Sequence, residues 1–320
     1  MGGPDEAVVC LGACAMDMMF TVDRLPEPDE MVFAEGEAGF FAGGSTANIA
    51  AGIGRLGYRS RFVGRTGDDE NGRKLRQAFE SDGVDVRWLT EIEGGRTAQT
   101  IIAVDRTGER VIYSLGGEAI LQKPDEFPDE AMVNAKVLYI GEVLPNVALE
   151  AIQVARRHCA TIIYGPGGGI SWMDKATLTG LIKSCDYVVL SRGELAAVTS
   201  SASHTEGAGR LLECGVGHVV VTLGSDGSEC HFCDSASGYG ECHHKVFRAP
   251  AFSIPDVIDT TGAGDSFTSG FITGLLEGMD TAECLMRGNA CAALAIRKVG
   301  AREAMPSGEE LKEFLQNAKM

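Results

Sequence analysis

Residues 259–271 read DTTGAGDSFTSGF and place small residues and an acid before an apolar run. Phe267, Phe271 and Leu275 recur at helical spacing, so the pattern predicts a turn that leads into a helix N-terminus. Glycines permit unusual backbone angles there, and the free N–H groups of a first helical turn bind negative charge. Such a cup suits a transferring phosphoryl group, and Asp265 beside it could accept the proton of an attacking hydroxyl. The plainer interpretation is that this acid only offsets the helix dipole.

Two stretches offer polar groups of the kind that bind hydroxyls. In GGSTANIAAGIGRLG, Gly43 and Gly44 let a ligand approach the backbone, and Asn48 offers both a donor and an acceptor. Asp17 stands five residues after Gly12, which ends a predicted strand, and a carboxylate is an acceptor that suits a vicinal diol. Taken alone, these residues are also compatible with a glycine turn, an asparagine facing a helix and an acid in a solvated loop.

The full string DTTGAGDSFTSGF resembles the C-terminal motif of the ribokinase-like sugar kinases, also called the PfkB family. GGSTANIAAGIGRLG and LGACAMD resemble earlier motifs of that family, and the motifs occur in the family's order over nearly the whole chain. The resemblance implies phosphorylation of a hydroxyl of a small carbohydrate, with ATP and Mg²⁺ as cofactors. It implies Asp265 as the general base and the backbone of Gly262, Ala263 and Gly264 as the anion hole.

The resemblance also implies binding residues on both sides of the reacting centre. On the substrate side they are Asp17, Gly43, Gly44, Asn48 and Glu142. On the ATP side they are Ser191, Glu194, Thr222, Gly224, Gly227 and Asn289. Glu194 would organise Mg²⁺ through water, while Asp259 either holds a K⁺ ion or caps the turn. Ser191 and Ala15 depart from the pattern, because family members have asparagine at these places.

Strands and helices must hold these residues in place. Short apolar runs predict strands at 7–12, 61–63, 137–140, 161–164, 187–190 and 219–223. Helical patterns cover 45–57, 71–82, 147–157, 193–198, 205–213, 264–278, 281–297 and 307–319, and Ser45 is the expected N-cap of the first helix. The β-rich runs 100–104 and 110–114 flank RTGE and predict a hairpin, and 31–34 predicts a short strand.

This alternation of strands and helices predicts an α/β fold, a ribokinase-like three-layer α/β/α sandwich around a mostly parallel sheet. No repeat or low-complexity linker divides the chain, so we expect residues 1–320 to form a single kinase domain. The segments of about 15–41 and 97–115 interrupt the alternation and are expected to form a small β-sheet lid. By resemblance, the lid excludes water from the substrate and its surface provides a homodimer contact.

The composition limits the partners of this chain. Its 320 residues carry a net charge of −17, which disfavours nucleic acid and anionic membranes. No apolar run reaches the ~18 residues of a membrane helix, and the first residues do not read as a signal peptide. The ten cysteines are scattered through core-like stretches, as expected for reduced, buried thiols. We therefore expect a cytoplasmic protein with a small-molecule substrate.

The sequence indicates the identity of the substrate less clearly than it indicates the reaction. GGSTAN, GACAMD and GEVLPN carry no lysine or arginine, which favours a neutral polyol, although Arg106 or Arg110 of the hairpin could reach the pocket. A nucleoside kinase of the same family would stack a base on aromatic residues, for which Phe40, Phe41 and Tyr113 are candidates. A binding protein without turnover on the same fold is a further alternative. A dinucleotide-binding dehydrogenase is disfavoured, because no GxGxxG follows the first strand.

Residues 230–244 read CHFCDSASGYGECHH and contain ligand types suited to zinc. The spacing of Cys230, Cys233 and Cys242 matches no common zinc finger, and the stretch follows the expected nucleotide loop. A strand pair with DSASGYGE as its turn is the simpler interpretation.

Overall fold

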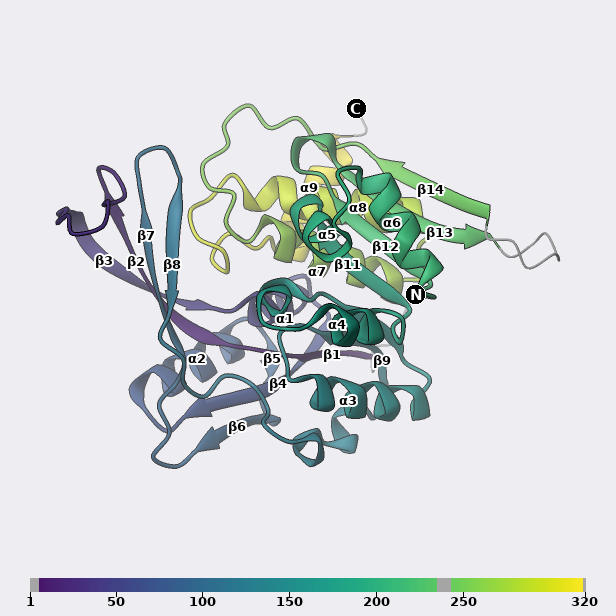
Figure 1. Ribbon diagram of the computed structural model, residues 1–320, viewed down its shortest axis with the longest axis horizontal. Helices are drawn as coiled ribbons and strands as arrows, with labels where there is room; N and C mark the ends of the chain where they lie inside the picture. Colours follow the sequence, from purple (N-terminus) through teal and green to yellow (C-terminus); the bar gives the residue numbers. More distant parts are fainter. Residues whose placement is uncertain (1–5, 235–242, 319–320) are drawn as a thin grey trace.

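A large sheet, flanked by helices, dominates the computed structural model, which describes residues 6–234 and 243–318 (Figure 1). The strand order is β14-β13-β12-β11-β10-β9-β1-β4-β5, and β6 also pairs with β4. All pairs are parallel except β12–β13 and β13–β14. The strands are β1 (Ala7–Leu11), β4 (Arg59–Gly67), β5 (Val84–Asp85), β6 (Leu89–Ile92), β9 (Ala135–Ile140), β10 (Thr161–Tyr164), β11 (Tyr187–Ser191), β12 (His218–Thr222), β13 (Ser228–Asp234) and β14 (His243–Ala249).

Helices cover both faces of the large sheet, because successive side chains of a strand point to opposite faces. Val8 and Cys10 of β1 join one core cluster, whereas Val9 and Leu11 join the other. The first face carries α1 (Ser45–Arg55), α2 (Glu70–Ser81), α7 (Ala263–Leu276) and α8 (Thr281–Ala295), and α9 (Gly308–Asn317) packs on α8. The second carries α3 (Pro145–Arg157), α4 (Lys175–Ile182), α5 (Arg192–Thr199) and α6 (His204–Glu213). The predicted α/β/α sandwich is confirmed.

Short 3-10 helices complete the regular structure. They lie at Pro124–Glu126, Asp129–Met132, Gly167–Ser171 and Gly224–Asp226.

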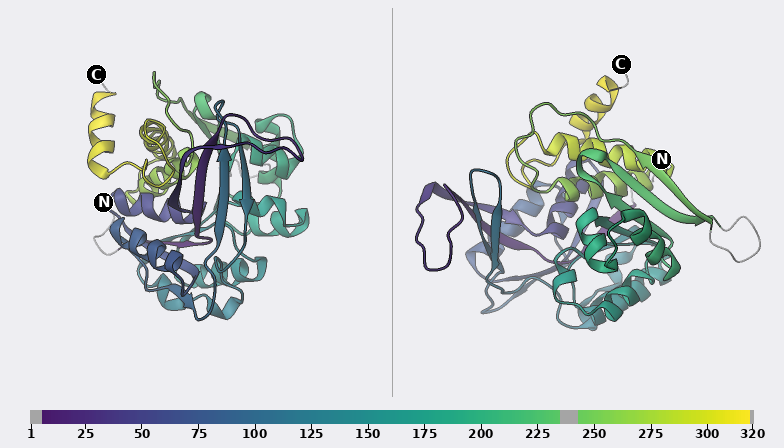
Figure 2. Two further views of the ribbon diagram at one scale, coloured as in Figure 1. Left: turned by 90° about the vertical axis from the view of Figure 1, so that its left-hand side faces the viewer. Right: turned by 45° about the horizontal axis from the view of Figure 1, so that its top comes forward.

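A second, four-stranded sheet, called the lid below, projects from the body (Figures 1 and 2). Its order is β3-β2-β7-β8, from β2 (Ala15–Val22), β3 (Ala34–Gly43), β7 (Gln99–Val104) and β8 (Arg110–Ser114). The strands β7 and β8 form the predicted antiparallel hairpin, while β2 pairs with β7 in parallel. The lid therefore combines two segments that are far apart in the sequence.

Several local predictions need correction. Residues 31–33 are not in a strand, and the strand of this region is Ala34–Gly43. Gly44, not Ser45, is the N-cap of α1, and it has φ 98°, a left-handed angle that favours glycine. The cysteines are not uniformly buried thiols, because Cys159 and Cys214 are exposed and Cys233 is disulfide-bonded.

The start of α1 is pressed onto the carboxyl ends of the central strands. A Cβ atom on Gly12, just after β1, would lie 2.2 Å from Thr46 Oγ1, and one on Gly141, just after β9, would lie 1.8 Å from the same atom. The strands β4 and β9 flank β1 on opposite sides, and open α/β sheets bind ligands where the strand order diverges. No helix in the described ranges is long and apolar enough to cross a membrane.

Candidate active site

The N-terminus of α7 forms a tight turn with two open N–H groups. Gly262 is its N-cap with φ 75°, and a Cβ there would lie 2.8 Å from Ala301 Cα. The N–H of Ala263 donates to the Thr260 carbonyl at 3.2 Å and closes the turn. Within the described residues, the N–H groups of Gly264 and Asp265 meet no acceptor, because they belong to the first turn of the helix. These two donors are open to an anion, and the turn that presents them is called the anion-binding cup below.

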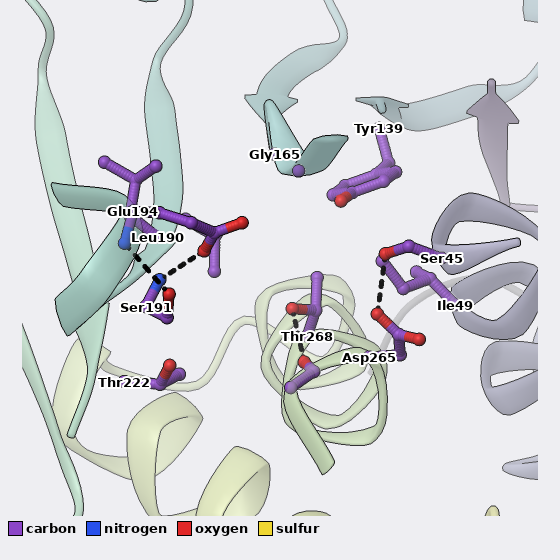
Figure 3. A pocket seen from close by; sticks show the side chains of 13 residues that line it. Ser45, Ile49, Tyr139, Gly165, Leu190, Ser191, Glu194, Thr222, Asp265 and Thr268 are labelled. Carbon is purple, nitrogen blue, oxygen red and sulfur yellow. Dashed lines mark hydrogen bonds between the residues drawn. The ribbon is translucent and has the colours of Figure 1, made fainter. Parts of the chain in front are cut away.

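The Asp265 carboxylate is held by two side chains of α1. Ser45 Oγ donates to Asp265 Oδ1 at 2.6 Å, as Figure 3 shows, and Asn48 Nδ2 donates to Oδ2 at 2.9 Å. Burial raises the pKa of Asp265 to about 6; the bonds from Ser45 and Asn48 oppose this shift, and the charges of Glu142 and Glu194 add to it. The carboxyl is therefore suited to exchange a proton near neutral pH.

The Asn48 side chain has one polar atom that is available to a ligand. Its Oδ1 is buried and has no hydrogen-bond partner in the described part of the chain. A buried acceptor without a partner is costly, so this oxygen is ready to accept a hydrogen bond from a ligand hydroxyl.

Three cavities meet at the start of α7. The first is lined by Asp265 on one side and by Ser191, Glu194 and Thr222 on the other (Figure 3), and Gly264 also lines it. The second, of about 600 Å³, shares Thr222 and Gly264 with the first. The third shares Asp265 with the first and opens under the lid. Asp265 thus faces the lid-side cavity and the cavity of Glu194 at once.

The 600 Å³ cavity has a largely apolar lining with several predicted ATP-side residues. Thr222, Gly224, Gly227 and Asn289 all line it, together with small or apolar side chains of α8. Gly227 has φ 92°, and a Cβ there would meet the Ala249 carbonyl at 2.1 Å. The Asn289 amide nitrogen donates to the carbonyls of Ala249 and Pro250 at 3.1 and 3.0 Å, so part of this side chain holds the wall in place.

Ser191 and Glu194 form a capping box at the start of α5. Glu194 Oε2 accepts from the Ser191 N–H at 2.7 Å, and Ser191 Oγ accepts from the Glu194 N–H at 3.2 Å. Both residues still line the first cavity. The serine that replaces the family's asparagine therefore caps the helix and orients the glutamate.

The cavity under the lid contains Asp17, Gly44, Asn48 and Asp265. Burial raises the pKa of Asp17, and the hydroxyl of Thr100 on the neighbouring strand donates to its carboxylate. A Cβ on residue 43 would lie 1.9 Å from Asp17 Oδ2, so only glycine fits there.

Three predicted residues lie next to the cavities without lining them. Gly43 gives Asp17 its space, as described above. Glu142 accepts from Thr46 Oγ1 at 3.2 Å and, more weakly, from the Gly168 N–H at 3.4 Å. Asp259 accepts from the N–H groups of Thr261 and Gly300, both at 2.9 Å, and so ties the turn to the loop that follows α8.

Sequence reasoning missed several lining residues. Ser45 was expected to cap α1, yet its hydroxyl binds Asp265 instead. Tyr139 of β9 and Thr268 of α7 also line the first cavity, and Thr268 Oγ1 donates to the Gly264 carbonyl at 2.8 Å (Figure 3). Thr268 belongs to the motif at 259–271 and lies one helical turn after Gly264. This spacing could have predicted that Thr268 lies at the site.

The cysteine-rich stretch offers no metal centre within the described residues. No three histidine, cysteine, aspartate or glutamate side chains of residues 6–234 and 243–318 come together in a way that could hold a metal ion. Cys230 is buried in β13, which pairs with β14 as predicted, and Cys242 lies outside the described residues.

Comparison with known proteins agrees with the geometry. Residues 5–308 match the model of the pfkB family carbohydrate kinases. This chain belongs to that family. It is 31% identical to an ATP-dependent ribose-1-phosphate kinase of Halopiger xanaduensis, over 96% of this chain and 97% of that protein. A nucleoside kinase of Methanothermobacter thermautotrophicus is 27% identical, over 97% of this chain and 96% of the relative.

The solved structures that resemble this pfkB-family fold include ribokinases. Arabidopsis thaliana ribokinase, complexed with ribose and ATP, superposes with a TM-score of 0.83 at 26% identity, covering 97% of this chain and 98% of the other. The chain is therefore a kinase that transfers a phosphoryl group from ATP to a hydroxyl. Membership of this family excludes the dinucleotide-binding dehydrogenase.

Proposed function

We propose that the chain phosphorylates a small sugar or sugar derivative and that Asp265 is its general base. The single observation that carries this proposal is the position of the Asp265 carboxylate. It lines the lid-side cavity and the cavity of Glu194 together, beside the open N–H groups of Gly264 and Asp265. In this proposal the substrate hydroxyl and the terminal phosphate meet where these two cavities join.

In the proposed reaction, Asp265 accepts the proton of the substrate hydroxyl as its oxygen attacks the γ-phosphorus of ATP. The bond from that phosphorus to the bridging oxygen of ADP breaks, so the phosphoryl group moves to the sugar. The N–H groups of Gly264 and Asp265 stabilise the charge on the phosphoryl oxygens. Asp17 and Asn48 would hold other hydroxyls, because both offer acceptors to the cavity under the lid.

ATP would occupy the remaining two cavities. The cavity of about 600 Å³ offers small and apolar side chains to a flat base, and Gly224 and Gly227 leave room for the ribose and phosphates. The phosphates would then extend past Thr222 to Gly264, which line both of these cavities.

The residues present suit Mg²⁺ held chiefly by phosphates. Magnesium keeps several waters and needs one or two carboxylates from the protein, and Glu194 faces the phosphate cavity with Oε1 uncommitted to the capping box. When bound, Mg²⁺ would neutralise part of the negative charge of the phosphates. Asp259 would hold K⁺ beside the turn, since its carboxylate already links the two backbone segments there.

The lid gives less support to a nucleoside substrate. Of the three aromatic candidates, only Phe41 lines the cavity, while Phe40 and Tyr113 are 63% and 60% exposed and line none of the three cavities.

The exposed rings of Phe40 and Tyr113 support a homodimer formed through the lid. Sedimentation velocity tests this, and a monomer would refute it. We also propose a cytoplasmic location, where a kinase has access to ATP.

Release of ADP over a panel of pentoses, hexoses, sugar phosphates, sugar acids and nucleosides tests the proposal. Asp265→Asn should lower turnover of the accepted substrate by at least about a thousandfold while ATP still raises the melting temperature. Residual turnover close to that of the unmodified enzyme would eliminate Asp265 as the base. The control Asp129→Asn removes an exposed acid that pairs with Arg157 outside all three cavities and should leave turnover unchanged.

A further inference from the structure

Two arginines flank the tip of the lid hairpin, and the structure gives them different roles. Arg106 is neutralised at the surface by Asp23 at 2.9 Å and by Glu35 at 2.5 Å. Arg110 instead lines the cavity under the lid, and its Nη1 donates to Thr261 Oγ1 at 3.2 Å. A cation of the lid therefore reaches across to the turn that precedes the anion-binding cup.

The guanidinium of Arg110 lies on the substrate side of that turn. Thr261 and Gly262 line the cavity under the lid, whereas Ala263 and Gly264 line the nucleotide cavity. Arg110 lines neither of the two cavities assigned to ATP. Its position therefore favours contact with the sugar rather than with the nucleotide.

The strand register sets Arg110 far from the diol-binding end of the cavity. Asp17 pairs with Thr100, and Arg110 pairs with Val104, four residues farther along β7. Four residues of a strand span about 13 Å. Ile102 and Ile112 pair between these two positions and line the cavity with apolar surface. A bare sugar bound at Asp17 would leave this outer end unfilled.

The charge of Arg110 has no close counterion in the described part of the protein. Arg302, the other arginine of the lining, is 3% exposed and bound to Asp82 at 2.7 Å. The nearby carboxylate of Asp259 accepts hydrogen bonds from two backbone N–H groups. The positive charge of Arg110 helps to lower the pKa of Asp259, but the two side chains form no ion pair. A guanidinium has five donors, and the contact with Thr261 uses one of them.

We propose that Arg110 binds an acidic substituent of the substrate, a phosphate or a carboxylate, at the end of the cavity remote from Asp17. Arginine binds both anions in bidentate fashion. This inference rests on the proposed function and replaces the neutral polyol that the substrate loops favour. The substrate class is then a sugar phosphate or a sugar acid.

Matched substrate pairs test this specificity. Ribose 1-phosphate is compared with ribose, and gluconate with glucitol, in the unmodified enzyme and in Arg110→Gln. The acidic member of one pair should have the higher kcat/KM, and Arg110→Gln should lower that value about 10- to 100-fold with little change for the neutral member. The pair that responds distinguishes phosphate from carboxylate. The KM for ATP should not change.

Arg106→Gln is the matched control, because it removes the same charge from the same hairpin outside the cavity. Equal losses on acidic and neutral substrates would overturn the inference and assign Arg110 to the transferred phosphoryl group. A preference for the neutral members would overturn it as well.

Titration calorimetry tests the inference without requiring turnover. It measures the binding of ribose 1-phosphate and of gluconate to the Asp265→Asn protein and to the Asp265→Asn, Arg110→Gln double variant. At least tenfold weaker binding of one of these anions on loss of Arg110 supports it, and unchanged binding of both contradicts it. Absence of ADP release from every compound would count against the proposed function alone.

Discussion

The hydroxyl of Ser45 donates a hydrogen bond of 2.6 Å to Oδ1 of Asp265, a residue 220 positions later in the chain. The bond joins the first turns of α1 and α7, which pack against each other. Helix α1, which lines the cavity under the lid, and helix α7 are therefore linked through the proposed base itself.

The first prediction concerns the acidic limb of the pH profile. A base must be deprotonated to act, so kcat/KM should fall about tenfold per unit as the pH drops below about 6, the raised pKa of Asp265. Ser45→Ala removes a bond that lowers this pKa, so the limb should move to higher pH. Ser45→Thr keeps the hydroxyl and should restore the limb. An identical limb in Ser45→Ala and the unmodified enzyme would contradict this account.

Two glycines of the turn should differ sharply in their tolerance of alanine. Gly262→Ala places a side chain at φ 75° and 2.8 Å from Ala301, so it should lower the free energy of unfolding by about 1–3 kcal/mol. Gly264→Ala meets nothing within 4 Å and should change it by less than about 1 kcal/mol. Urea unfolding measures both values, and equal shifts would show that the turn is not strained.

The ion pair of Asp82 and Arg302 should behave as a buried pair. Asp82→Asn leaves the charge of Arg302, which lies over the Phe79 ring, without its counterion, and should cost about 3 kcal/mol of unfolding free energy. Asp82→Leu combined with Arg302→Met removes both charges and should be less destabilising than Asp82→Asn alone. Chemical denaturation of the two variants decides this, and a more damaging double substitution would refute the argument.

Potassium should raise turnover through Asp259. A bound cation would fix the backbone beside the anion-binding cup, so kcat should be several-fold higher in KCl than in choline chloride at equal ionic strength. Asp259→Asn should abolish the difference between the two salts. A kcat that is independent of the cation would remove K⁺ from the proposal.

The elements that the sequence predicts well are those with a local signal. The strand β1 is buried at all five positions, and its apolar run is evident. The strand β3 was misplaced because most of Ala34–Gly43 is exposed and rich in glycine and glutamate; pairing with β2 determines it. Helix α4 was missed because Lys175–Ile182 is short and its apolar pattern is weak.

The same distinction applies to the site. The turn at Gly262 could be predicted because its backbone requirement is encoded in adjacent residues. The bond from Ser45 to Asp265 could not, because the two residues lie 220 positions apart. The sequence offered both Arg106 and Arg110 for the pocket, and only the contact of Arg110 with Thr261, 151 positions away, distinguishes them. Only the packing of distant elements brings such pairs together.

The placement of Asp17 and Arg110 on one sheet has a mechanical consequence. Asp17 lies near the base of the lid, where β2 leaves the body, and Arg110 lies near its outer end. If the lid tilts about its base, the arginine sweeps a wider arc than the aspartate. The cavity under the lid would then keep a nearly constant width at Asp17 and would change its width most at Arg110. Ligands of different lengths would be accommodated at this outer end.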